Sequence, residues 1–209
     1  MLRIVDLHKR FLSKPVLRGV NLEIRAGDRV LLTGPNGSGK TTLMRIACAM
    51  VRPDRGEVTW DGQNAWEDAR GHRSRFGVLM DEPFLMPDAT LGENLALFSR
   101  LSGAKDGAMA AWIDRFSLAT LLESPVRTLS KGERKKPGRG GGSLAAPAFL
   151  LWDEPMTGLD SASRETLSRA MGEFSGTILF SSHESTQGIP WITRTLRLLA
   201  GKLEETHAG

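Results

Sequence analysis

The sequence has no apolar run long enough to cross a membrane. Of its 209 residues, 40% are hydrophobic and 25% are charged, yet the longest unbroken apolar stretch, residues 144–152, has nine residues and includes Pro147. A membrane-spanning helix needs about 20 apolar residues, so we expect that the chain itself does not span a bilayer. The first six residues also lack the apolar stretch and cleavage site of a signal peptide. The composition predicts one globular domain with a sizeable core.

The chain is also poor in cysteine and contains no tyrosine. A single cysteine, Cys48, excludes an intrachain disulfide and, with the absence of a signal peptide, favours a cytosolic location. We expect Cys48 to be a buried core thiol. The sequence contains no internal repeat and no heptad pattern, and it has no Asn-Lys-x-Asp motif, which argues against recognition of guanine.

Acidic residues are outnumbered by basic ones, and the excess is local. The chain has 28 Lys and Arg against 24 Asp and Glu, a formal net charge of +4. Such an excess can indicate a nucleic-acid partner. However, residues 131–139 hold five of the cations and one acid, so the rest of the chain is formally neutral. We therefore expect no nucleic-acid partner.

Strand patterns and amphipathic stretches alternate along the chain. Residues 3–7 and 20–24 alternate apolar and polar side chains, as half-buried strands do, and residues 25–28 indicate a turn. Further strands are predicted at residues 30–33, 57–60, 76–80, 148–152, 177–180 and 195–199. Helices are predicted from residue 41 to about residue 50, on two apolar faces between residues 88 and 135, and on a face formed by Leu167, Ala170, Met171 and Phe174. Buried strands that alternate with helices predict a parallel sheet covered on both faces.

A complete phosphate-binding loop lies between a predicted strand and a predicted helix. Residues 34–41 read Gly-Pro-Asn-Gly-Ser-Gly-Lys-Thr and match the P-loop pattern at every fixed position. Glycines allow the backbone to curl so that N–H groups point at phosphate oxygens, and the helix adds its positive end. Lys40 would neutralise the β- and γ-phosphates, and the Thr41 hydroxyl would be a Mg²⁺ ligand. The alternative is a glycine-rich turn that only reverses the chain. The predicted nucleotide-binding residues are Gly34, Pro35, Asn36, Gly37, Ser38, Gly39, Lys40, Thr41 and Thr42.

Two acidic residues follow the buried strand predicted at residues 148–152. Asp153 would lie at the carboxyl end of that strand, beside the phosphate loop, where α/β sheets bind ligands. There it would hold Mg²⁺ through the water shell of the metal. Glu154 would take a proton from the attacking water, a role worth about 10²–10⁴-fold in rate. The alternative is an exposed acidic turn before Pro155.

These patterns together predict an α/β fold with a P-loop NTPase core and a mostly parallel sheet. We assign residues 1–30 and 55–80 to an N-terminal antiparallel β lobe. Residues 30–52 and 148–209 form the core, and an inserted helical subdomain covers about residues 88–135. The whole chain forms a single domain.

The order of the motifs resembles the ATP-binding subunit of an ABC transporter. The P-loop is followed by Leu-Ser-Lys-Gly-Glu at residues 129–133, by Leu-Leu-Trp-Asp-Glu-Pro at 150–155, by Thr-Gly-Leu-Asp at 157–160, and by His183 after a strand. The resemblance covers nearly all of residues 1–209 and implies an ATPase that uses ATP and Mg²⁺. The short chain is similar to small exporter ATPases, including the haem-exporter type.

The resemblance assigns further residues to the nucleotide. His183 matches the switch histidine that contacts the γ-phosphate, so the implied catalytic residues are Glu154, His183 and Lys40. Phe11 lies where the family has an aromatic residue that stacks on adenine; its alternative is an ordinary core phenylalanine. Asp81 occupies the position where the family usually has a Gln that senses Mg²⁺ and the membrane partner. An acid there could reach the metal through water, and the alternative is a solvated turn residue.

The resemblance also implies a head-to-tail dimer in which each active site is shared. Ser130 and Gly132 match the signature loop that closes over the γ-phosphate bound to the other subunit, and Asp160 matches a dimer-contact residue. Lys131 replaces a small residue of the usual signature, and Glu133 stands where Gln is commonest. The alternatives are helix N-caps at Ser130 and at Asp160.

The implied partners are integral membrane permease subunits, together with a second copy of this chain or a paralogous ATPase subunit. The implied location is cytoplasmic, on the inner face of the cell membrane, and the implied direction is export. Two other functions remain open: a nucleotide-binding module with weak or no ATPase activity, and a soluble relative that acts on ribosomes or DNA. The last class usually carries a second nucleotide domain or long coiled coils, and this sequence has neither.

One segment departs from the family pattern. Residues 137–147 contain two prolines and four glycines where the family continues a helix after the signature loop. We hypothesise a compensated frameshift, which resequencing of the coding DNA would test. If the segment is genuine, the helix behind Ser130 is compromised and the ATPase would be weak.

Overall fold

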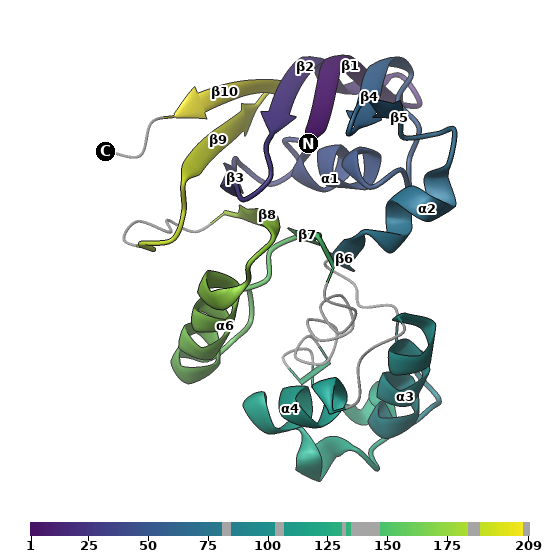
Figure 1. The fold of residues 1–209 in the computed structure, drawn as a ribbon, viewed down its shortest axis with the longest axis vertical. Coiled ribbons are helices and arrows are strands. Elements are labelled where there is room, and N and C mark those ends of the chain that lie inside the picture. The colour runs from purple at the N-terminus through teal and green to yellow at the C-terminus, as the bar shows by residue number, and fades with distance from the viewer. Residues whose placement is uncertain (81–84, 103–106, 131–132, 135–146, 184–188, 207–209) are drawn as a thin grey trace.

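Two β-sheets and a separate group of helices build the chain in the computed structural model (Figure 1). The structure describes residues 1–80, 85–102, 107–130, 133–134, 147–183 and 189–206. Asp81, Gly132 and most of the unusual segment at residues 137–147 therefore lie outside the described residues.

The first sheet is antiparallel, with four strands in the order β2-β1-β4-β5. Its strands are β1 Leu2–Phe11, β2 Lys14–Ile24, β4 Arg55–Trp60 and β5 Gln63–Asn64. Leu2, Ile4 and Leu7 of β1 are at most 1% exposed, and more exposed residues lie between them, as expected of a sheet with one buried face. The antiparallel sheet predicted near the N-terminus is confirmed.

The second sheet has six strands in the order β10-β9-β3-β8-β7-β6. Its strands are β3 Arg29–Thr33, β6 Phe76–Leu79, β7 Phe149–Trp152, β8 Thr177–Ser182, β9 Arg194–Leu199 and β10 Lys202–Thr206. All neighbouring pairs are parallel except β9 and β10. The mostly parallel sheet is thus confirmed.

The assignment of residues 55–80 to the β lobe is wrong at its C-terminal end. β6 pairs in parallel with β7, with Phe76 opposite Phe149, and therefore belongs to the second sheet. The error has a physical cause: a four-residue apolar run predicts a buried strand but does not specify its partner.

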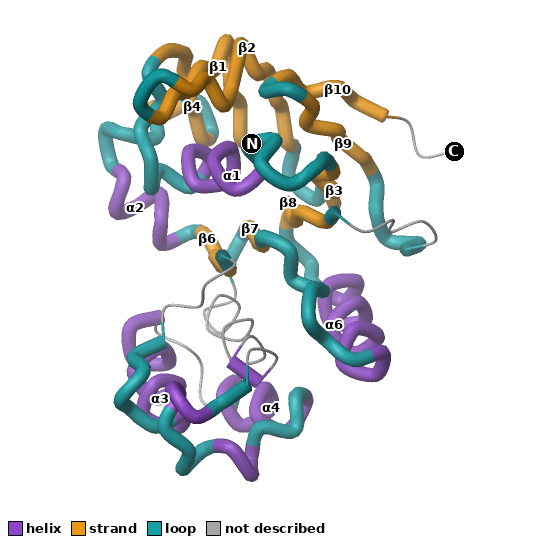
Figure 2. The backbone as a smooth tube through the Cα atoms, turned by 180° about the vertical axis from the view of Figure 1, so that it is seen from behind, coloured by secondary structure: helices purple, strands orange, loops and turns teal. Residues whose placement is uncertain are grey.

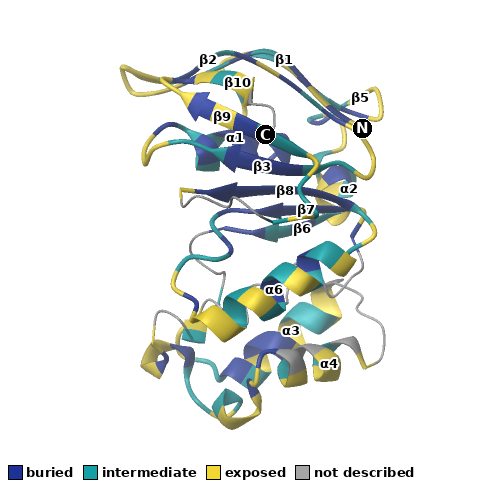
Figure 3. Ribbon diagram, turned by 90° about the vertical axis from the view of Figure 1, so that its left-hand side faces the viewer, coloured by how far each residue is buried: buried dark blue, intermediate teal, exposed yellow. Residues whose placement is uncertain are grey.

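The helices lie on both faces of the second sheet. Their bounds are α1 Lys40–Ala47, α2 Ala69–Ser74, α3 Leu91–Ser102, α4 Ala108–Arg115 and α6 Ser161–Glu173, with 3₁₀ turns at Ala119–Leu121 and Val126–Thr128. Figure 2 shows α1 beneath the antiparallel sheet, and Figure 3 shows α6, α3 and α4 on the opposite side of the parallel strands. Within the described ranges, no helix is both long enough and apolar enough to span a bilayer.

Strand β3 lies between two hydrophobic clusters. Val30 and Leu32 pack in the cluster that contains Leu43 of α1, whereas Leu31 packs in the cluster that contains Leu167 of α6. The period of two follows from the alternation of side chains along a strand. Since β3 and β7 run parallel within one sheet, their carboxyl ends meet at one edge, which is where ligands bind in such folds.

Candidate nucleotide-binding and hydrolysis site

The phosphate loop connects the end of β3 to the start of α1, as predicted, and its backbone conformation requires glycine. Gly34 and Gly39 have φ angles of 147° and 107°. A Cβ atom on Gly34 would lie 2.3 Å from the carbonyl oxygen of Leu198, and one on Gly39 would lie 3.0 Å from Cγ1 of Val16. The loop is therefore packed closely against neighbouring backbone and side chains, as a phosphate cradle requires.

A pocket of about 440 Å³ joins this loop to the acidic pair, which follows more than 100 residues later in the sequence. Its lining consists of Val16, Asn36, Gly37, Gly39, Lys40, Thr41, Thr42, Asp153 and Glu154. All of these except Val16 were predicted from the sequence. Gly34, Pro35 and Ser38 do not line the pocket, but the first two supply carbonyls to Lys40. Ser38 has a buried Oγ with no hydrogen-bond partner among the described residues, which suits an anionic ligand.

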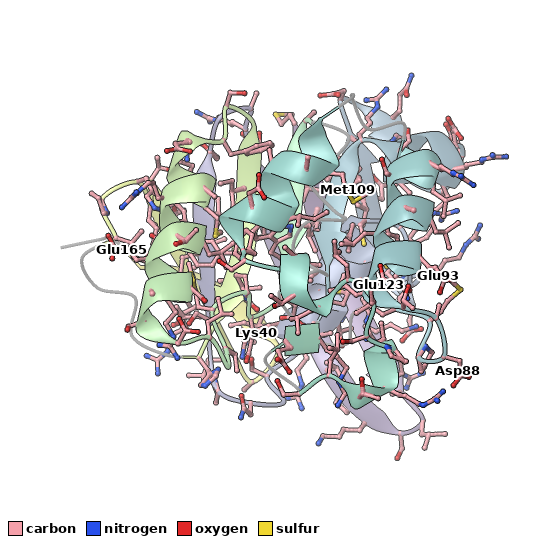
Figure 4. All side chains as sticks on the ribbon, turned by 90° about the horizontal axis from the view of Figure 1, so that it is seen from below. Lys40, Asp88, Glu93, Met109, Glu123 and Glu165 are labelled. Carbon is pink, nitrogen blue, oxygen red and sulfur yellow. The ribbon has the colours of Figure 1, made fainter. Side chains whose placement is uncertain are left out.

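Lys40 is held in the loop by backbone carbonyls. Its side chain donates to the oxygens of Gly34 and Pro35 at 2.8 and 3.3 Å, and the residue is only 5% exposed. The N-terminus of α1 has no side-chain cap, so its first N–H groups point toward the loop without a side-chain acceptor. Cationic and N–H donors thus converge on one pocket, a combination that binds phosphate. Figure 4, a view from the helical side, labels Lys40 together with Glu165 of α6 and Glu93 of α3, two helices that lie on the other side of the parallel strands from α1.

Asp153 lies at the carboxyl end of β7 and is 3% exposed. The interpretation of this residue as part of an exposed acidic turn is therefore wrong. Its Oδ2 accepts a hydrogen bond from the Thr41 hydroxyl at 2.5 Å. A hydroxyl and a carboxylate in contact at the edge of a phosphate pocket are oxygen donors of the kind that Mg²⁺ prefers, and the donor set therefore fits this ion.

Glu154 forms a cluster with two residues from later segments. Its Oε2 lies 2.9 Å from Nδ1 of His183 and accepts a hydrogen bond from the Thr157 hydroxyl at 3.1 Å. The backbone of Glu154 has a φ of 48°, a left-handed conformation that is uncommon for a residue with a Cβ. The structure therefore brings Glu154 and His183 together as the resemblance implied, and it adds Thr157.

A second residue that the sequence did not reveal is Ser181 of β8. Its hydroxyl donates to Oδ1 of Asp153 at 2.5 Å and accepts from the backbone N–H of Glu154 at 2.9 Å. The available signal was a pair of serines at the end of an otherwise apolar strand, just before His183. A polar residue in a fully buried strand needs a hydrogen-bond partner, and that partner is the acidic pair.

Phe11 lies at the end of β1 and is 49% exposed, so the interpretation as an ordinary core phenylalanine is wrong. The Lys9 ammonium lies 5.4 Å from the centre of its ring. Phe11 does not line the pocket, and its stacking on adenine stays a prediction.

Ser130 and Asp160 both act as helix N-caps. Ser130 Oγ accepts from the N–H of Glu133 at 3.2 Å, and the Glu133 carboxylate accepts from the N–H of Ser130 at 2.8 Å, which is a capping box. Asp160 caps α6 by accepting from the N–H of Ser163 at 2.8 Å. Neither residue lines the pocket. Their roles across a dimer stay predictions, while Gly132 and Asp81 lie outside the described residues.

Comparisons with known proteins agree with this geometry. The family model described as ABC transporter matches residues 17–157. The chain is 34% identical over 179 residues to the cytochrome c biogenesis ATP-binding export protein CcmA of Rhodospirillum rubrum. The matched region covers 82% of this chain and 75% of that protein.

Two solved structures have the same fold. A structure described as the ATP-binding subunit of an ABC transporter superposes with a TM-score of 0.88 at 25% identity, over 99% of this chain and 89% of the other. A dimeric ATP-binding cassette bound to ADP and Pi in a post-hydrolysis state also has a TM-score of 0.88, over 100% and 99% of the two chains, and at 22% identity it shows the fold alone. The chain therefore belongs to the ABC transporter family, as an ATP-binding subunit.

Proposed function

We propose that this chain binds MgATP in the pocket between the phosphate loop and Asp153, and that Glu154 and His183 promote its hydrolysis. The observation that carries this proposal is the convergence of Lys40, Thr41, Asp153 and Glu154 on one pocket of about 440 Å³. Phosphoryl transfer requires mainly positioning and neutralisation of charge, and these four residues supply both.

Each residue would have a distinct task. Lys40 and the loop N–H groups would neutralise the β- and γ-phosphates, for which Lys40 leaves its carbonyl partners. Thr41 and Asp153 would hold Mg²⁺, which supplies further positive charge to the phosphate oxygens. Glu154 would accept the proton of the attacking water, and its contacts with His183 and Thr157 would orient it.

The complete active site would form between two ATPase subunits arranged head to tail. Ser130 and Gly132 of one subunit would contact the γ-phosphate bound to the other, and Asp160 would contribute to the dimer contact. The second subunit would be another copy of this chain or a paralogue. Asp81 would reach the metal through water.

The mechanical output would be movement of integral membrane permease subunits, with this chain on the cytoplasmic face of the membrane. The similarity to an ATP-binding export protein supports export as the direction. The similarity also favours an active ATPase over a module that binds nucleotide without turnover.

Glu154→Gln tests the proposal. The substitution preserves size and hydrogen bonding but removes the base, so the variant should bind ATP, lose hydrolysis by about 10²-fold or more, and accumulate as a closed dimer. A matched control is Glu165→Gln, which neutralises an exposed acid on α6. Hydrolysis by Glu154→Gln at the parent rate would show that Glu154 is not the base, and a parent protein without steady-state turnover would show that the chain only binds nucleotide.

A further inference from the structure

The hydroxyl of Ser181 contacts both acidic residues of the site. It donates to Oδ1 of Asp153 at 2.5 Å and accepts from the N–H of Glu154 at 2.9 Å. A serine hydroxyl has one proton and two lone pairs. When the proton is given to Asp153, a lone pair remains for the N–H, so a single orientation of the hydroxyl satisfies both neighbours.

Burial makes these two contacts difficult to replace. Ser181 is 0% exposed and Asp153 is 3% exposed, so solvent does not reach them freely. Each carboxylate oxygen of Asp153 accepts a hydrogen bond from a different hydroxyl: Oδ1 from Ser181 and Oδ2 from Thr41. Ser181 therefore fixes the plane of the Asp153 carboxylate and directs Oδ2 toward Thr41, the residue expected to bind Mg²⁺.

The same hydroxyl anchors the backbone of Glu154. That residue has a φ of 48°, which is strained for a side chain with a Cβ and persists only where neighbouring groups hold it. The bond from its N–H to Ser181 is such a restraint. His183 follows Ser181 by two residues, so two neighbouring side chains at the end of β8 contact Glu154. Ser181 accepts from its backbone N–H, and His183 contacts its carboxylate.

We propose that Ser181 is a positioning residue that couples the metal-binding carboxylate of Asp153 to the geometry of the base Glu154. This inference rests on the proposed function. Loss of the hydroxyl removes one of the two hydroxyl contacts that hold the Asp153 carboxylate, and it releases the anchor of Glu154. Binding of the nucleotide without metal depends on the loop and on Lys40, and it stays intact.

The experiment compares Ser181→Ala with a matched control, Thr177→Val. Thr177 lies on the same strand and the same face, four residues earlier, and its hydroxyl accepts from the N–H of Gly27 far from the pocket. Both variants lose one buried hydroxyl from β8, so an effect of general destabilisation would be common to both. The probe is N-methylanthraniloyl-ATP, titrated with full-length protein in EDTA and again in Mg²⁺, alongside steady-state ATP hydrolysis.

For Ser181→Ala, affinity for the ATP analogue in EDTA should stay within about twofold of the parent. The Mg²⁺ concentration that gives half-maximal binding should rise about tenfold, and kcat should fall about 10–100-fold. Losses of this size are typical when a residue that hydrogen-bonds to a metal ligand is removed. Thr177→Val should match the parent in all three measurements. A folded Ser181→Ala protein with the parent Mg²⁺ dependence and kcat would overturn the inference, as would equal losses in the control.

If Ser181→Ala does not fold, Ser181→Cys keeps the size of the side chain but offers only a weak donor, and its Mg²⁺ dependence decides in the same way. If the parent protein itself does not hydrolyse ATP, the proposed function fails. The effect of Mg²⁺ on nucleotide binding would then still show whether Ser181 positions Asp153.

Discussion

Replacement of Lys40 by methionine should weaken nucleotide binding without destabilising the protein. Lys40 is 5% exposed, and among the described residues its ammonium contacts only the carbonyls of Gly34 and Pro35. Burial of a cation without an anionic partner is unfavourable. The chain keeps this lysine at a cost in stability that the phosphates of the nucleotide would offset.

The loss of affinity can be worked from these contacts. A unit charge about 4 Å from the ammonium interacts with it by about 4 kcal/mol at an effective dielectric constant of about 20. To make that contact Lys40 gives up two hydrogen bonds, each worth about 0.5–1.5 kcal/mol net. The difference, about 1–3 kcal/mol, corresponds to a loss of affinity of about 5–150-fold.

Fluorescent ATP-analogue binding in EDTA measures this loss, and thermal unfolding without nucleotide measures stability. Methionine keeps most of the apolar stem of the lysine side chain, so the unfolding temperature should equal or exceed that of the parent. Lys202→Met, at an exposed position on β10, is the control for net charge. Unchanged ATP affinity in Lys40→Met would refute the assignment of this loop to phosphate binding.

Arg29, Phe11 and Cys48 each lead to a further expected outcome. Arg29 donates to the carbonyls of Met171 and Phe174 at the end of α6. Arg29→Met should therefore lower the free energy of unfolding, measured by urea denaturation, by about 2–4 kcal/mol. No change would mean that water satisfies both carbonyls. If the ring stacks on adenine, Phe11→Ala should weaken ATP binding by about 5–150-fold and leave tripolyphosphate binding unchanged. Equal losses for both ligands would contradict stacking. Burial raises the pKa of Cys48 to about 11, so little thiolate exists at about pH 8. Iodoacetamide should therefore label this residue only after unfolding. Rapid labelling of the folded protein would show that the thiol is accessible.

Much of the fold was predictable because strands and helices of ordinary length have clear patterns. The strands predicted at residues 30–33 and 177–180 correspond to β3 and β8, and the β3–loop–α1 unit follows its motif. β10 was missed because an edge strand with Leu203 as its one apolar residue has no buried pattern. α2 was missed because a six-residue polar helix, ARGHRS, has no apolar face.

The residues that carry the chemistry of the site were predictable from motifs, whereas the residues that hold the acidic pair in place were not. Lys40, Asp153 and Glu154 belong to short motifs in which each residue has a mechanistic reason. Ser181 and Thr157 contact the acidic pair through the packing of β8 and of the loop after β7, and such contacts depend on tertiary structure. Sequence spacing does not show which of two adjacent serines points toward a carboxylate.

The N-cap at Ser130 and the proposed dimer role of this residue are compatible. Ser130 Oγ accepts from the N–H of Glu133, and an accepted hydrogen bond uses a lone pair but not the hydroxyl proton. The proton can therefore be donated to a phosphate oxygen while the cap persists. The cap also fixes the hydroxyl at the positive end of a helical turn, which favours an anion. An N-cap at this position is thus not evidence against a signature loop, because it is one way to hold the serine ready for a phosphate of the opposing subunit.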